Sequence, residues 1–453
     1  MSPQPIAGVE PVELLRQLLR IRSVNPPGDE AGVAEILEQY LGDAGLKTTI
    51  VTSPCGRVNL VARVEGPRDR PALVLLSHSD VVPIEEDSWT RDPFGAELHD
   101  GFVWGRGALD MKGIAVMHAA AASGLVRAAR RLGREVIVVV VADEEAGADE
   151  GAHWLLDEHA ALVGFGEGRP APEVIGEGAY GITGVLGRPV IPVALGEKTA
   201  VWFEILADGD SGHGALPPAD QAPVKLAEII THAAGFGTPR VHPVLREQFA
   251  TLAEAASGAQ AAVFRALASP AGPAVSRLIA SKLRQAGALG LLLSDSITPT
   301  AITTGYKSNV VPGEARASFD CRLLPDTDID DFVSSHDKNA RRRGGRIINV
   351  VQKGHGPVSG KGPLLDLLNE VSRQIVPAGL PIVSLSPGIT DLRFFRARGA
   401  TGYGWTPLVL APDLLTTIHG HDERIPVTEF ERAVMAMSDA VARAATFETK
   451  GLS

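Results

Sequence analysis

Cysteine is scarce in this chain of 453 residues, which holds only Cys55 and Cys321. The two are far apart and have no CxxC spacing, so we interpret both as free thiols in a reducing compartment. The segment MSPQPIAGVEPVELL also lacks the basic and then apolar stretches of a secretory signal. The sequence therefore predicts a cytoplasmic protein.

Basic runs and long apolar runs are missing as well. The formal net charge is −11 and no basic stretch offsets it, which argues against general nucleic-acid binding. The leucine-rich run Leu289–Leu293 is too short to cross a membrane. What remains, 45% hydrophobic and 21% charged residues, is an ordinary globular composition. A length of 453 residues allows two or three domains of about 150 residues each.

Three short segments have the pattern of strands that are buried on both faces. Ala72–Leu76 is apolar throughout, Glu135–Ala142 reads EVIVVVVA, and Glu173–Gly178 is a third strand-like run. Segments with helical spacing, such as Met111–Ala129, lie between them. Because strands that alternate with helices indicate βαβ units, we expect an α/β fold with a mixed, mainly parallel sheet flanked by helices.

The pattern changes after about residue 194. Segments from Ala200–Ala207 onward follow the order β-α-β-β-α-β, which is typical of a small ferredoxin-like α+β domain. Residues 241–293 are rich in alanine and leucine and predict extra helices within it. From residue 356 the α/β style returns. We therefore predict a discontinuous α/β domain, 1–193 and 356–453, and an inserted domain, 194–355.

Acidic residues and histidines occur where the apolar segments end. Because ligands of open α/β sheets bind beyond the carboxyl ends of the strands, these side chains are candidates for one site. They are His78, Asp80, Glu144, Glu145 and Glu177, joined by Asp110 at a helix start and His419 in IHGHDER. Imidazole and carboxylate ligands suit zinc, and also cobalt or manganese. Two histidines and three carboxylates, one of them shared, can hold two ions about 3.5–4 Å apart.

Each of these residues also has a plainer interpretation when it is taken alone. A histidine after a strand is usually a loop or core residue, and adjacent glutamates usually form the acidic start of a helix. Asp110 can be an N-cap, and Glu177 a loop carboxylate. Only their convergence on one edge of the sheet favours a metal site. By sequence alone Asp143 competes with Glu144, and His421 with His419.

The segments around these residues resemble the M20 metallopeptidase family. They are SHSDVVP, WTRDPFGAELHDGFVWGRGALDMKG, ADEEAGADEGA, IGEGAYG and HGHDERI, in the family's order over almost the whole chain. The family groups carboxypeptidase S, glutamate carboxypeptidase, aminoacylase-1, acetylornithine deacetylase and succinyl-diaminopimelate desuccinylase. The resemblance implies a catalytic domain with two zinc ions, for which cobalt or manganese can substitute.

The resemblance also implies the roles at the metals. The ligands would be His78 and Glu177 on one ion, Glu145 and His419 on the other, and Asp110 between them. Asp80 would orient His78. Glu144 would be the general base for a metal-bound hydroxide nucleophile. The family's H-G-x-[DN]-E spacing favours His419 over its rival.

Further residues are assigned to the substrate by the same resemblance. Arg393, Asn309 and Arg322 occupy positions that contact the substrate carboxylate in the family, and a guanidinium can hold a carboxylate bidentately. His213 resembles a lid histidine that reaches a neighbouring subunit's site and stabilises the oxyanion. The plainer interpretations are exposed arginines, a strand-edge asparagine and a loop histidine. The resemblance implies a homodimer through the inserted domain, which serves as the lid.

From these features we predict a dinuclear zinc hydrolase that cleaves a peptide or N-acyl amide bond next to a free carboxylate. Residues 241–293 are longer than the corresponding part of the short desuccinylase-type members, which favours small peptides or N-acyl amino acids as substrates. Two alternatives stay open: a dedicated biosynthetic N-deacylase of the acetylornithine or succinyl-diaminopimelate type, and a non-catalytic homologue without metal. No membrane or nucleic-acid partner is expected.

Overall fold

A computed structural model describes residues 10–279, 282, 288–352, 356–376 and 378–446 of the chain. The chain divides into two compact units. The first unit consists of Met1–Gly196, Gly356–Ser384 and Thr390–Ser453, and the second of Glu197–His355 and Leu385–Ile389. Among the described residues, no helix is both long and apolar enough to cross a membrane.

The first unit is built around an eight-stranded sheet in the order β1-β2-β6-β3-β7-β17-β8-β16. Its strands are β1 (Lys47–Thr52), β2 (Val58–Val64), β3 (Leu73–His78), β6 (Val136–Val141), β7 (Glu173–Val185), β8 (Arg188–Glu197), β16 (Leu380–Ser386) and β17 (Thr401–Leu410). A small sheet joins β4 (Leu98–His99), β5 (Phe102–Trp104) and β18 (Arg424–Pro426). The pairs β6–β3, β3–β7 and β7–β17 are parallel, which confirms the predicted α/β fold with a mixed, mainly parallel sheet.

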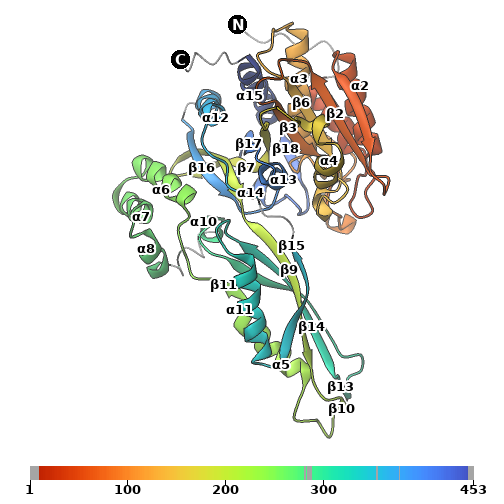
Figure 1. The fold of residues 1–453 in the computed structure, drawn as a ribbon, viewed down its shortest axis with the longest axis vertical. Helices are drawn as coiled ribbons and strands as arrows, with labels where there is room; N and C mark the ends of the chain where they lie inside the picture. Colours follow the sequence, from red (N-terminus) through yellow and green to blue (C-terminus); the bar gives the residue numbers. More distant parts are fainter. Residues whose placement is uncertain (1–9, 280–281, 283–287, 353–355, 377, 447–453) are drawn as a thin grey trace. The chain divides into compact units, whose positions relative to one another are not determined.

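Helices cover both faces of this sheet (Figure 1). They are α1 (Pro11–Leu19), α2 (Ala31–Asp43), α3 (Lys112–Arg127), α4 (Ala152–Glu158), α12 (Pro363–Ile375), α13 (Leu392–Ala397), α14 (Pro412–Leu415) and α15 (Val427–Thr446). Short 3₁₀ turns occur at η1 (Glu86–Ser88), η2 (Glu144–Ala146) and η3 (Ala160–Val163). The alanine-rich sequence of α3 favours a helix and lets it lie close to β3, β6 and α15.

The central strands are buried because both of their faces are apolar. Every residue of β3 and of β6 is buried. Val74 and Leu76 of β3 pack in one cluster with Leu155 of α4 and Phe395 of α13. Side chains of a strand alternate between its faces, so Leu73, which is also fully buried, lies toward the other layer of helices. This arrangement fixes the carboxyl ends of β3 and β6 side by side.

Two features of the sheet differ from the sequence-based expectation. The third strand does not end after Glu177 but continues to Val185 as β7. Its pairing with β17 shifts there: Gly404 pairs with Gly176 and Thr406 with Tyr180. Residues 177–179 of β7 thus lie opposite the single residue Trp405 of β17 and form a bulge at Glu177. Strands β8, β16 and β17 were not predicted, and in β17 the glycines and the proline hide a buried central strand.

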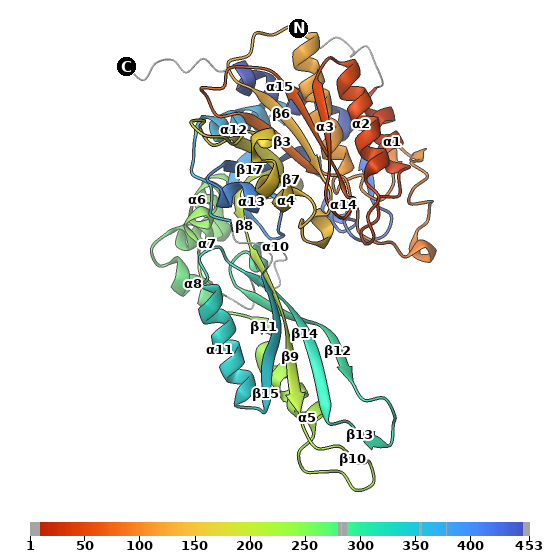
Figure 2. The same ribbon diagram turned by 45° about the vertical axis from the view of Figure 1, so that its right-hand side comes forward.

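The second unit is a five-stranded antiparallel sheet in the order β11-β12-β14-β9-β15 with two helices packed on it (Figure 2). Its strands and helices are β9 (Thr199–Asp208), β10 (Gly212–His213), α5 (Ala222–Ala233), β11 (Gly235–Phe236), β12 (Ser296–Thr304), β13 (Val310–Val311), β14 (Glu314–Leu323), α11 (Ile329–Arg341) and β15 (Gly345–Gln352). Without the two-residue β11, the spatial order is that of a ferredoxin-like domain, as predicted.

The extra helices predicted between residues 241 and 293 are present where the structure describes that segment. They are α6 (Pro243–Ala255), α7 (Gly258–Ala268), α8 (Gly272–Leu278) and α10 (Ala288–Leu291). Phe249 of α6 stacks on Phe264 of α7 at a centroid distance of 6.1 Å. The roles predicted for the two parts, a catalytic domain and a lid, stay a prediction.

Candidate metal centre

His78 is the last residue of β3 and its imidazole is buried. The backbone carbonyl oxygen of Asp80 lies 3.0 Å from its Nδ1 atom. Because a carbonyl oxygen only accepts hydrogen bonds, Nδ1 carries a proton and donates it. The Nε2 atom is thereby directed at Asp110 and Glu177, which is the orientation a metal-binding histidine needs.

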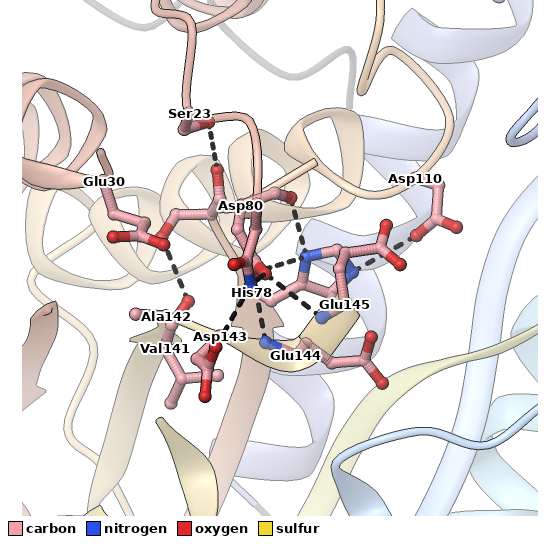
Figure 3. A network of polar contacts seen from close by, with 12 residues as sticks. Ser23, Glu30, His78, Asp80, Asp110, Val141, Ala142, Asp143, Glu144 and Glu145 are labelled. Carbon is pink, nitrogen blue, oxygen red and sulfur yellow. Dashed lines mark hydrogen bonds and ion pairs between the residues drawn. The ribbon is translucent and has the colours of Figure 1, made fainter. Parts of the chain in front are cut away.

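The buried carboxylate of Asp80 ties the end of β3 to the end of β6 (Figure 3). Its Oδ1 accepts a hydrogen bond from the backbone of Glu144 at 3.2 Å, and its Oδ2 accepts one from Glu145 at 3.1 Å. The side-chain amide of Asn25 donates a further bond at 2.8 Å. Burial alone would raise the pKa of Asp80, but its bonds to His78 and Asn25 outweigh burial and lower it. Asp80 therefore stays ionised and fixes the two glutamates.

Two groups of three side chains are placed so that they could hold a metal ion. In each group every side chain offers one ligand atom, and the three ligand atoms lie within 4.8 Å of one another. The groups are His78, Asp110 and Glu177, and Asp110, Glu145 and His419. In the first group, Nε2 of the histidine lies 3.2 Å from Asp110 and 3.8 Å from Glu177. In the second group, Nε2 lies 3.1 Å from the other Asp110 oxygen and 3.3 Å from Glu145. Asp110 thus offers one oxygen to each group.

These separations fit the coordination of a small divalent cation. Ligand atoms about 2.1 Å from a tetrahedral ion lie about 3.4 Å from one another, close to the distances within each group. The set of two histidines and three carboxylates is also the chemistry that zinc, cobalt or manganese accepts. All five residues predicted as ligands are therefore brought together, and their assignment as ligands is a proposal.

The electrostatics of the five side chains favour a cation among them. Burial raises the pKa of Glu177 well above its ordinary value, and the charge of Asp110 adds to this. Burial would lower the pKa of His78, but the hydrogen bond to Asp110 raises it well above the usual value. The pKa of His419 rises to about 10 because of its bonds to Asp110 and Glu145. Without a metal, bound protons thus offset the negative charge of the acidic side chains. A cation that binds among them would displace these protons.

Glu144 lies beside the two groups but belongs to neither. Its carboxylate is buried, and among the described residues its Oε1 atom has no hydrogen-bond partner. Burial raises its pKa well above the ordinary value, and the nearby charge of Asp391 contributes. The Arg393 guanidinium is 3.8 Å away. A buried carboxylate that is not engaged by hydrogen bonds is available to exchange a proton.

Arg393, which the sequence analysis assigns to the substrate, is buried in the first unit. Its Nη1 donates to the carbonyl of Thr390 at 2.7 Å, and the guanidinium stacks on Phe394 at 4.2 Å. Its Nε and Nη2 atoms have no hydrogen-bond partner among the described residues. Two free donors on one planar group match the geometry of a carboxylate.

Asp143, the sequence rival of Glu144, has a different environment. Its backbone has φ = 65°, in the left-handed region. Its carboxylate accepts hydrogen bonds from Asn25 at 3.1 Å and from Arg57 at 3.0 Å, and from the backbone of Glu150 at 3.1 Å. Asp143 is thus an anchor of the turn that carries the two glutamates, and its carboxylate is engaged by hydrogen bonds where that of Glu144, in the described part of the chain, is not. Sequence reasoning missed Asn25 and Arg57 because only the fold brings them here.

The remaining predicted residues lie in the second unit. His213 of β10 pairs with Val310 of β13, and the backbone of Gly214 donates to the carbonyl of Asn309 at 2.9 Å. His213 and Asn309 are therefore neighbours, and both are exposed. Arg322 lies at the other end of β14, where it donates to Asp320 at 2.7 and 2.9 Å. In the first unit, His421 is exposed and belongs to neither group of ligand atoms among the described residues.

Known proteins resemble this chain along most of its length. The family model "Peptidase family M20/M25/M40" matches residues 74–443. Aminoacylase-1 of Sus scrofa is 28% identical over 435 residues, covering 93% of this chain and 92% of the relative. Succinyl-diaminopimelate desuccinylase of Phenylobacterium zucineum (strain HLK1) is 28% identical over 455 residues, covering 96% and 99%. The structure of Sso-CP2, an M20 family metallo-carboxypeptidase of Sulfolobus solfataricus, has a TM-score of 0.73 at 18% identity and covers 96% of this chain and 99% of that chain.

Proposed function

The chain belongs to peptidase family M20/M25/M40 and is a hydrolase of amide or peptide bonds, and we propose that it uses two divalent cations to cleave such a bond next to a free carboxylate. The observation that carries the proposal is the pair of ligand groups that share Asp110. His78 and Glu177 would complete one cation site, and Glu145 and His419 the other. We propose zinc as the metal, with cobalt or manganese as substitutes.

When bound, the two cations would lower the pKa of the attacking water and polarise the scissile carbonyl. The chain's own residues would do the rest. Glu144, buried beside both groups, would take the proton of the attacking water and give it to the leaving nitrogen. Asp80 would hold His78 and the turn of Glu144 in place through its hydrogen bonds. His213, Asn309 and Arg322 are retained as proposed substrate contacts, and of these Arg322 has the weakest support because Asp320 engages it.

Arg393 would hold the free carboxylate of the substrate. Its two unengaged donors and its burial make it a strong bidentate site. This explains why a carboxylate next to the scissile bond would be required, and it favours small peptides and N-acyl amino acids as substrates. A dedicated biosynthetic N-deacylase stays a second candidate, because a succinyl-diaminopimelate desuccinylase matches the chain at the same 28% identity as an aminoacylase-1.

Assembly and location extend the proposal. We propose a homodimer through the second unit, in which Leu216 and Tyr306 expose 82% and 85% of their surface. The free Cys55 and Cys321 support a cytoplasmic location. Light scattering of the purified chain tests the assembly, and a monomer would contradict it.

The test of the function combines metal analysis with a substrate panel. We expect two divalent ions per chain and hydrolysis of dipeptides or N-acyl amino acids, with much slower turnover of the same compounds when their carboxylate is an amide. The variant R393K keeps the charge but loses the planar fork, so kcat/KM for the free carboxylates should fall roughly 10–100-fold while the amides change little. The control R398K alters an exposed arginine of the same segment that is paired with Asp157.

Each outcome of the panel has a clear meaning. Absence of bound metal and of hydrolysis for every compound would favour a non-catalytic homologue. A sharp preference for one N-acyl metabolite would favour the biosynthetic deacylase. Equal losses on free and amidated substrates in R393K would contradict the proposed carboxylate contact.

A further inference from the structure

Glu423 is a fully buried carboxylate that belongs to neither group of ligand atoms in the described part of the chain, yet it accepts four hydrogen bonds. Its Oε1 accepts from the backbone of Leu109 at 2.7 Å and of Asp110 at 3.1 Å. Its Oε2 accepts from Nη1 of Arg106 at 2.7 Å and from the backbone of Gly107 at 3.0 Å. One side chain therefore holds the whole turn that ends in Asp110, which we name the Asp110 turn (residues 105–110).

Arg106 extends this contact to the segment of His419. Its guanidinium is buried and lies over Trp89 at 5.3 Å. Its Nη2 donates to the carbonyl of Gly420 at 2.7 Å, directly after the histidine. The backbone of Gly105 also donates to the carbonyl of Glu423 at 2.9 Å. The Asp110 turn and residues 419–423, which we name the His419 loop, are thus joined by side chains from both segments.

The His419 loop needs such support. His419 has φ = 58° and Asp422 has φ = 57°, a backbone region that residues other than glycine adopt at a cost of about 1–3 kcal/mol. The His419 side chain is 52% exposed, so packing does little to fix it. On its far side the loop is held by Asp422, which accepts bonds from Thr90 at 2.8 and 3.0 Å. The position of the imidazole therefore depends on the bonds of its loop.

A buried ion pair is a poor source of stability, because desolvation offsets much of the attraction. A geometric role better explains why the pair of Arg106 and Glu423 lies between the candidate ligands Asp110 and His419. We propose that Arg106 and Glu423 are positioning residues that set the separation of Asp110 and His419, and so the affinity for the cation between Glu145 and His419. The inference rests on the proposed dinuclear function. The ion between His78 and Glu177 would depend on the pair only through Asp110 and should be affected less.

The test is cation binding by the full chain after removal of metal, measured by calorimetric titration with Zn²⁺ and by the absorption spectrum with Co²⁺. In E423Q an amide group replaces one oxygen and cannot accept the bonds that oxygen accepts. We expect the affinity for the cation between Glu145 and His419 to fall roughly 10–100-fold, as for other groups that orient ligands, while the affinity for the cation between His78 and Glu177 changes less. R106K should give the same pattern, because one ammonium cannot span both Glu423 and Gly420.

The matched control is E135Q. Glu135 is also fully buried and paired with arginines, Arg63 and Arg169, but it precedes β6 at the end opposite the site. We expect E135Q to lose thermal stability and to keep both cation affinities.

The inference is overturned if E423Q loses stability as E135Q does but binds both ions with wild-type affinity, since the pair would then be structural only. If E423Q does not fold, R106K decides by the same criterion. A wild-type chain that takes up no cation contradicts the proposed function itself, which separates the two failures.

Discussion

Glu144 and Glu145 are neighbours in the chain, but their environments give them different chemistry. Glu145 lies 3.3 Å from Nε2 of His419 in a ligand group, whereas Glu144 belongs to neither group among the described residues and lies 3.8 Å from the Arg393 guanidinium. Both backbone amides donate to the same Asp80 carboxylate. One turn thus supplies a candidate ligand and, beside it, the carboxylate that we propose as the general base.

At this scale the first expected outcome concerns E144Q. Glutamine keeps the size of the side chain but cannot take a proton, so kcat should fall by roughly 10²–10⁴-fold. Metal content should not change, because Glu144 belongs to neither ligand group. Elemental analysis and turnover are measured on the same sample.

The control for this variant is E158Q, the same replacement at an exposed position of α4. It should retain wild-type activity. If E144Q stays active with full metal content, the base is another residue.

At the scale of elements, β7 and β17 show how backbone geometry places a candidate ligand. A Cβ atom on Gly404 of β17 would lie 2.5 Å from the carbonyl oxygen of Glu177 and 3.2 Å from Cα of Gly178. Only glycine allows β17 to approach the bulge of β7 so closely. Gly404 therefore helps to place the Glu177 carboxylate next to His78.

We expect G404A to push the bulge away from β17. Overpacking of this kind costs about 1–3 kcal/mol of stability, and the cation between His78 and Glu177 should bind more weakly. Urea unfolding and metal titration measure the two effects. G124A in α3 is the control, because nothing lies within 4 Å of the added Cβ and the helix should gain stability. If G404A binds cations as the wild type does, the close approach of β17 to β7 does not determine the position of Glu177.

Helix α3 carries a buried histidine that predicts a dependence of stability on pH. Burial lowers the pKa of His118 to about 3. Between pH 6.5 and 3 the unfolded chain binds a proton that the folded chain does not, so stability falls as the pH falls through this range. From pH 7 to pH 5 the loss from this group should be about 2 kcal/mol.

The variant H118L should not show this loss. Chemical unfolding of both proteins at pH 7 and pH 5 should show that the free energy of unfolding of the wild type falls by the larger amount. H232L, at an exposed position of α5, controls for the removal of a histidine. Parallel pH profiles of wild type and H118L would show that the buried imidazole is not responsible.

At the scale of the whole molecule, all five candidate ligands belong to the first unit. A cation that binds only the folded state stabilises it by about 2.7 kcal/mol when its concentration is 100 times its Kd. Removal of metal by a chelator should therefore increase hydrogen exchange in β3, β6 and β7. Strands β9 and β14 of the second unit should keep their protection, since no described ligand group includes a residue from it.

Mass-spectrometric hydrogen exchange with and without added Zn²⁺ measures both units in one experiment. The second unit serves as the internal control. If chelation increases hydrogen exchange equally in both units, the cations stabilise the chain as a whole and not the first unit alone.

The sequence by itself determined the strands β3 and β6, because an unbroken apolar run needs no partner to be recognised as buried. It also provided the five candidate ligands, because all of them lie within recognisable motifs and His78 and Asp110 stand where a predicted strand ends and a predicted helix begins. Elements whose signal is local were therefore predicted well. The ferredoxin-like order of the second unit is of the same kind, since it follows from the succession of local patterns.

Only the tertiary structure decided which distant residues share a bond. It placed Asn25 and Arg57 on Asp143, and Glu423 under the backbone of Asp110. It also showed that β17 is a central strand and that Glu177 lies in a bulge of β7. The physical reason is that a hydrogen bond or a close backbone approach depends on the distance between residues in space, which the spacing of residues along a chain does not specify.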